Sequence, residues 1–310
     1  MSRTRSSGLP ALAFAVLVAV AACSSAAGPS PSAGVSASAL ADPATPTPQP
    51  SPTAFPTFTP WPTTASSTPG PSAKPVSGTW VYDVYDARAV RWQNPDMTAC
   101  TAASALMMLN MATYWQNYAP ASGAVPAASK PNTWTPDVSY ARQESILAYQ
   151  RKTGTMLLSW PGADAHGWRD SLNYDGWGSI KAGVYTDQSF TSFDAAAKAT
   201  VMAIALYRKP VGILGWAGNH AQIVTGYRVK GGDPRTGATN FTIVGVYVTD
   251  PLKGDGFRDR YFTIATWKSG AKTIKFTPYT MTNSPYVDSI DGHQGNAEWD
   301  GKWVTVAPVK

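Results

Sequence analysis

The chain of 310 residues contains few residues that could bind a metal ion or form a disulfide bond. It has only two cysteines, Cys23 and Cys100, and three histidines, His166, His220 and His293. These residues do not stand at the short spacings of zinc sites, and the chain has neither an EF-hand pattern nor a glycine-rich phosphate-binding loop. We therefore expect no bound metal ion and no cofactor.

Charged residues are also scarce. They make up 14% of the chain, and the formal net charge is +6. The sequence contains no run of lysine or arginine that would follow a phosphate backbone, so we expect no nucleic-acid partner.

The most apolar stretch of the chain, LPALAFAVLVAVAA, ends at Ala22 and follows two arginines, Arg3 and Arg5. It is too short and too rich in small residues for a comfortable transmembrane helix, and it has the layout of an export signal. The tetrapeptide VAAC, ending at Cys23, resembles a bacterial lipobox. We predict that residues 1–22 are a lipoprotein signal peptide and that Cys23 is lipidated, with an ordinary secretory signal as the alternative.

Residues 23–76 are rich in proline, serine and threonine, and their only charged residues are Asp42 and Lys74. Such a segment cannot bury enough apolar surface to offset the entropy lost on ordering, so we predict a disordered linker. Proline-rich chain favours an extended conformation of about 3.1 Å per residue, which would give the linker a reach of roughly 150 Å.

Residues 77–310 form one predicted globular domain. Helical patterns dominate its first half and strand patterns its second half, so we expect an α+β fold and not alternating βαβ units. The segment 98–115 is apolar on almost every side, which predicts a buried helix. Ser192 is the expected N-cap of a helix that stops before Pro210. The other expected helices span 140–153 and 168–174, and the expected strands span 210–217, 220–229, 240–250 and 258–269.

Cys100 lies near the predicted start of the buried helix, with Thr98 or Asp96 as the expected N-cap. A reactive thiol needs a lowered pKa, because the thiolate is the attacking species. The positive end of a helix and a nearby imidazolium both lower the pKa of a thiol. The position therefore favours a nucleophile, although a lone cysteine is often only a small buried apolar residue.

The strand that begins at His220 and the strand that ends at Asp250 are joined by a loop centred near residue 235. In an antiparallel hairpin about that centre, the two residues face each other with Cβ atoms about 5 Å apart. The carboxylate would then hold one imidazole nitrogen and leave the other for a thiol. Taken separately, a core histidine and a turn-forming aspartate are simpler interpretations. We place His166 in a surface loop or at a cleft rim, and His293 in a C-terminal loop.

Three segments resemble the bacteriocin-processing cysteine peptidases (the thirty-ninth peptidase family) and their free-standing bacterial relatives. QNPDMTACTAASALMML resembles the family's Gln…Cys-Gly-Pro-Ala-Ser helix start, GNHAQIVTGYRV its Gly-x-His strand, and VYVTDPLKG its strand ending in Asp-Pro. Thr101 and Ala102 stand where the family has Gly-Pro. The family's leader-processing enzymes are fused to a transporter, and nothing in this sequence resembles one, so a leader-peptide substrate does not follow.

The resemblance implies a papain-like cysteine peptidase fold, in which a buried N-terminal helix carrying the cysteine packs on a C-terminal antiparallel sheet. It implies that Cys100 is the nucleophile, His220 the general base and acid, Asp250 the orienting carboxylate, and Gln93 a donor to the oxyanion hole. The expected activity is cleavage of peptide or related amide bonds through a Cys100 acyl-enzyme. We expect the protein to lie on the outer face of the bacterial cytoplasmic membrane, or to be secreted.

Two other functions stay open at this point. An acyltransferase could use the same triad, with an amine or thiol in place of water. A catalytically silent binding module could use its tryptophans to line a groove, but the presence of all four implied site residues favours an enzyme. We expect a monomer, with a peptide or amide substrate and a membrane contact through the lipid on Cys23.

Overall fold

The computed structural model describes residues 78–118, 135–156, 161–254, 256–271, 274–280 and 298–309. The chain divides after Thr68 into two units, and all described residues belong to the second, Pro69–Lys310. The predicted signal peptide, the lipidation site Cys23, the predicted linker and His293 lie outside the described residues. No helix among the described residues has both the length and the apolar character needed to cross a membrane.

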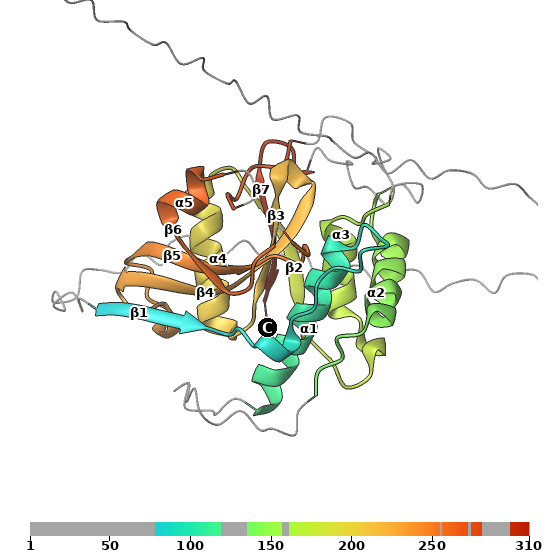
Figure 1. The fold of residues 1–310 in the computed structure, drawn as a ribbon. Coiled ribbons are helices and arrows are strands. Elements are labelled where there is room, and N and C mark those ends of the chain that lie inside the picture. Colours follow the sequence, from blue (N-terminus) through green and yellow to red (C-terminus); the bar gives the residue numbers. More distant parts are fainter. Residues whose placement is uncertain are drawn as a thin grey trace, which may run out of the picture. The chain divides into compact units, whose positions relative to one another are not determined.

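The described residues form a mixed α and β structure, which confirms the predicted α+β class (Figure 1). An antiparallel sheet of seven strands has the order β2-β7-β3-β4-β5-β6, and β1 pairs with β4 beside this path. The strands are β1 Gly78–Asp83, β2 Tyr185–Phe190, β3 Val211–Gly215, β4 His220–Gly231, β5 Phe241–Thr249, β6 Arg260–Thr263 and β7 Trp303–Pro308. The helices are α1 Cys100–Tyr118, α2 Tyr140–Thr153, α3 Ala165–Asn173, α4 Phe193–Tyr207 and α5 Ile264–Ser269.

Several sequence predictions are confirmed by these bounds. Helix α2 has the predicted ends, and α4 begins after Ser192, whose hydroxyl accepts the N–H of Ala195 at 3.2 Å. The predicted strand 258–269 is wrong in its second half, where α5 forms with Thr263 as its N-cap. Strands β1, β2 and β7 were not predicted, because each is short and its partner lies far away in the sequence.

The apolar side chains form two cores that share the sheet. One core joins α1, α2 and α3 to residues of β3, β4 and β7, and the other joins α4 and α5 to the remaining sheet residues. Figure 1 shows α1, α2 and α3 gathered together, with α4 and α5 on a separate part of the sheet. Helix α1 is therefore enclosed by protein, which explains why its sequence is apolar on almost every side.

A buried amide anchors the first turn of α1 to its two neighbouring helices. The Gln150 side chain accepts the Thr101 hydroxyl at 2.9 Å and donates to the Ser171 hydroxyl at 3.0 Å. Helices α2 and α3 approach closely here, since a Cβ atom at Gly167 would lie 2.2 Å from the carbonyl oxygen of Gln150. The start of α1, and Cys100 with it, is therefore held in a defined position.

Candidate active site

Cys100 is the first residue of α1, and its side chain is half-buried. Ala99 directly precedes the helix, so the prediction of Thr98 or Asp96 as N-cap is wrong. The incoming loop is instead held by Gln143 of α2, whose amide accepts the N–H of Asn94 at 2.9 Å and donates to the carbonyl oxygen of Trp92 at 2.9 Å. Contacts with α2 thus hold the chain that leads into α1.

His220 and Asp250 come together as the sequence suggested. His220 opens β4, and Asp250 directly follows β5. The imidazole Nε2 lies 3.0 Å from Asp250 Oδ2, and the two residues are only 3% and 1% exposed. Since Nε2 is hydrogen-bonded to the carboxylate, the other ring nitrogen, Nδ1, is the one that can hydrogen-bond to the thiol.

The predicted strand register that led to this pair is wrong by two residues. Ile223 pairs with Thr249 and Val224 with Val248, which puts Gln222, not His220, opposite Asp250. Two register shifts within the hairpin cancel each other. A displacement by two residues keeps every side chain on its original face, so His220 still reaches Asp250 from the diagonal position.

The Asp250 carboxylate is fixed by donors from three directions. Besides the imidazole, the Gln222 amide donates to Oδ2 at 2.6 Å, and the N–H of Leu252 donates to Oδ1 at 2.8 Å. Gln222 was not among the predicted site residues. The alternation of side chains along a strand could have indicated this role, because Gln222 is two residues after His220 and points to the same side of the sheet.

The thiol and the imidazole shift each other's protonation. Burial alone would raise the pKa of Cys100, but the hydrogen-bonded His220 imidazole and the N–H groups of Ala221 and Thr101 outweigh it and hold that pKa below its usual value. Burial alone would lower the pKa of His220, but its hydrogen bonds to Asp250 and Cys100 raise it to about 9. Both shifts favour the charged forms, a thiolate on Cys100 and an imidazolium on His220.

A strained turn leads into His220. Trp216, Ala217 and Gly218 have φ values of 52°, 59° and 96°, which lie in the left-handed region. The two non-glycine residues cost roughly 1–3 kcal/mol each. The turn places the Trp216 ring 4.3 Å from the imidazole of His220, at a tilt of 34°, and the hydroxyl of Thr277 accepts the Ala217 N–H at 2.8 Å. The tryptophan covers the imidazole that binds Asp250, a role the sequence analysis missed.

Gln93 is attached to the site through its backbone. Its N–H donates to the carbonyl oxygen of Pro251 at 2.7 Å, directly after Asp250. Its side-chain nitrogen donates to the carbonyl oxygen of Met97 at 2.9 Å, and its side-chain oxygen is buried with no hydrogen-bond partner among the residues that the structure describes. One of the two amide hydrogens is thus used within the loop that leads to Cys100, and the second remains available to a ligand.

His166 lies neither in a surface loop nor at a cleft rim, contrary to the sequence prediction. It belongs to α3 and is 2% exposed, between the carboxylates of Asp187 and Glu298. Burial alone would lower the pKa of His166, but hydrogen bonds to these two carboxylates raise it to about 9. The prediction failed because the partners lie far from residue 166 in the sequence. None of these three residues is on the strands and helix that carry Cys100, His220 and Asp250.

We expect Gln222→Leu to lower the free energy of unfolding by about 1.5–3 kcal/mol, because a buried carboxylate loses one of its donors. Urea denaturation of the full chain measures this change. Gln188→Leu is the matched control, since Gln188 is a half-buried glutamine on another strand of the sheet, β2. Equal losses of stability in the two variants would contradict the assigned role of Gln222.

A scan against protein-family models, a search of curated proteins and a search of solved structures found no match.

Proposed function

We propose that this protein is a cell-surface cysteine peptidase or amidase of papain-like fold that cleaves peptide or related amide bonds. The observation that carries the proposal is the chain of contacts from the Cys100 sulfur through His220 to Asp250. The lowered pKa of Cys100 and the raised pKa of His220 are the shifts that a nucleophilic thiol and a general acid require. The arrangement of a buried helix against a sheet supports the papain-like assignment.

In the acylation step, the Cys100 thiolate attacks the carbonyl carbon, forming a C–S bond as the carbonyl π electrons move to oxygen. When the tetrahedral intermediate collapses, the His220 imidazolium gives its Nδ1 proton to the departing amine, and a thioester on Cys100 remains. In the second step, His220 takes a proton from water, which attacks the thioester. The carboxylic acid leaves, and Cys100 returns to the thiolate form.

The intermediate oxygen needs two hydrogen-bond donors near Cys100. The first helical N–H groups of α1 have no partner within the helix, so the backbone N–H of Cys100 supplies one donor. The second amide hydrogen of Gln93 supplies the other. Removing a donor of this kind typically slows catalysis by about 10²–10³-fold.

The test is the rate of Cys100 alkylation by iodoacetamide against pH, in the full chain carrying Cys23→Ser so that one thiol reports. We expect a rate that stays high below pH ~6, because an ordinary thiol titrates near 8.5. A rate that rises only near pH ~8.5, or labelling only in denaturant, would contradict the proposal of an enzyme and favour a binding module. Peptides and cell-wall amides are then screened with and without an added amine, because an acyltransferase would give the amine adduct and a hydrolase the free acid.

We also propose that a lipid on Cys23 anchors the protein to the outer face of the bacterial cytoplasmic membrane. The lipobox-like VAAC sequence supports this proposal. Cells fed a labelled fatty acid should incorporate it into the wild-type chain and not into Cys23→Ser. Equal labelling of the two chains would exclude the anchor, and no labelling of either would favour secretion.

A further inference from the structure

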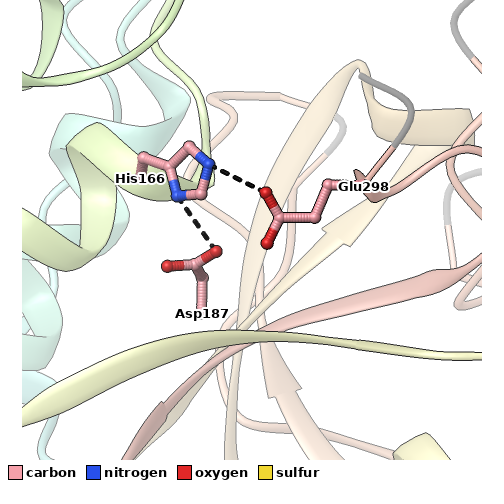
Figure 2. Close-up of side chains that lie close together, drawn as sticks. All are labelled: His166, Asp187 and Glu298. Atoms are coloured by element: carbon pink, nitrogen blue, oxygen red, sulfur yellow. Dashed lines mark ion pairs between the residues drawn. The ribbon is translucent and has the colours of Figure 1, made fainter. Parts of the chain in front are cut away.

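Apart from the proposed catalytic residues, a second group of ionisable side chains meets where three chain segments converge. His166 comes from α3, Asp187 from β2, and Glu298 from the residues before β7 (Figure 2). The imidazole Nδ1 lies 3.1 Å from Asp187 Oδ2, and Nε2 lies 3.2 Å from Glu298 Oε2. One nitrogen or oxygen atom from each residue lies within 4.8 Å of the others.

One imidazole nitrogen and two carboxylate oxygens are ligands that suit zinc and similar divalent transition metal ions. In a tetrahedral zinc site with bonds of about 2.0–2.1 Å, neighbouring ligand atoms lie roughly 3.3 Å apart. One ligand atom from each of the three residues lies within 4.8 Å of the others, so a small movement of one side chain brings them to that separation. We propose that His166, Asp187 and Glu298 form a binding site for a divalent metal ion of the zinc type.

The surroundings hold the ligands in place. The guanidinium of Arg169 donates to the second oxygen of Asp187 at 2.7 Å, and the ring of Trp299 lies 4.6 Å from the imidazole. Such outer contacts orient the ligands of a metal site. Asp187 is thereby held in one orientation, with its other oxygen directed at His166.

The local charge favours a cation. Two further carboxylates lie beside the cluster: Asp164 acts electrostatically on His166, and Asp170 accepts from Arg169 at 2.7 Å. Together with Asp187 and Glu298 these make four carboxylates. Arg169 supplies one positive charge, and Lys302, which donates to the carbonyl oxygen of Glu298 at 2.8 Å, supplies another, so negative charge remains in excess and favours a dication.

The ion replaces the imidazole proton, which leaves to solvent, because a metal-bound ring nitrogen must be unprotonated. An ion can take only one of the two ring nitrogens, so one carboxylate must move to reach it. The Glu298 side chain is 41% exposed and that of Asp187 only 3%, so Glu298 is the member that reorients. Its exposure also gives the ion, and a water molecule as a further ligand, a route from solvent. The bound ion would fasten the segment before β7 to α3 and β2.

The proposal is tested by calorimetric titration of Zn²⁺ into the full chain carrying Cys23→Ser and Cys100→Ser, so that no thiol competes for the ion. We expect one ion per chain and a higher melting temperature in its presence. Co²⁺ bound in the same place should give the intense visible absorption of a four-coordinate site. Saturation at one ion per chain is required.

Two variants in the same background locate the ion. Glu298→Gln removes the exposed ligand and should weaken binding at least 10-fold. Asp175→Asn, at a side chain that is 86% exposed, should leave the affinity unchanged. No saturable uptake, or equal affinity in Glu298→Gln and the parent chain, would overturn the metal site and leave the cluster as a buried ion-pair network only. Urea denaturation checks that each variant is folded.

Discussion

Substituting His220 by alanine is expected to slow Cys100 alkylation at pH 6 by up to about 300-fold. The lowered pKa of Cys100 depends on the imidazolium, which donates a hydrogen bond to sulfur and adds positive charge. Without it, the thiol returns to a pKa near 8.5, at which only about one molecule in 300 is a thiolate at pH 6. Burial raises the pKa of the thiol further and lowers the rate, whereas the greater nucleophilicity of a more basic thiolate acts in the opposite direction.

The measurement is the rate of iodoacetamide labelling by intact-mass spectrometry, in the full chain carrying Cys23→Ser. Asn219→Ala is the control, because Asn219 is the exposed neighbour of His220 and leaves the imidazole in place. Urea denaturation of each variant separates a lost imidazole from a lost fold. Comparable rates in His220→Ala and the parent chain at pH 6 would show that the imidazole does not activate the thiol.

Asp250→Ala is expected to lower the free energy of unfolding by about 3–5 kcal/mol, because His220 and Gln222 both lose a buried partner. The pKa of His220, about 9 in the native protein, should also fall, since the hydrogen bond to Asp250 is the main force that opposes burial. Its value should move toward or below 6.5, the ordinary value for histidine. The imidazolium would then be lost over the range from pH 6.5 to 9, where the native protein keeps it.

Urea denaturation gives the free energy, and NMR titration of labelled histidine gives the pKa. Asp250→Asn is the matched variant, because an amide oxygen still accepts from Nε2 while the negative charge is gone. It should lose less stability than alanine and should show a pKa of His220 between those of the other two chains. A His220 pKa that stays near 9 in Asp250→Ala would assign the shift to groups other than this carboxylate.

The parts of the fold that the sequence predicted well are those that depend on neighbouring residues. Helices α2 and α4 were predicted from their own segments of sequence, and Ser192 follows from the chemistry of an N-cap. Strand β4 also begins where the turn residues before it predicted. Strand β7 pairs with β2 and β3, which lie more than 90 residues away in the chain, so no local pattern predicts it.

The candidate site shows the same difference between features that depend on neighbouring residues and features that depend on distant ones. Cys100 and His220 could be picked out because cysteine and histidine are rare in this chain, and Asp250 because it ends the strand predicted to pair with that of His220. The predicted pairing of the strands that carry His220 and Asp250 differs from the observed pairing by two residues. The two side chains still meet, because side chains along a strand alternate with a period of two and so stay on the same face. Gln222 and Trp216 were not predicted, since a glutamine or a tryptophan has many uses in a domain.

By itself, the sequence determined the α+β class, the helices with clear local signals and the identity of the rare reactive side chains, because propensity, capping and composition are local properties. Tertiary structure alone decided that the thiol lies against the imidazole, that Gln222 holds Asp250, and that His166 is buried between Asp187 and Glu298. These contacts join residues that are far apart in the chain. They form because packing of the helices and the sheet excludes water, and buried polar groups must then find partners within the protein.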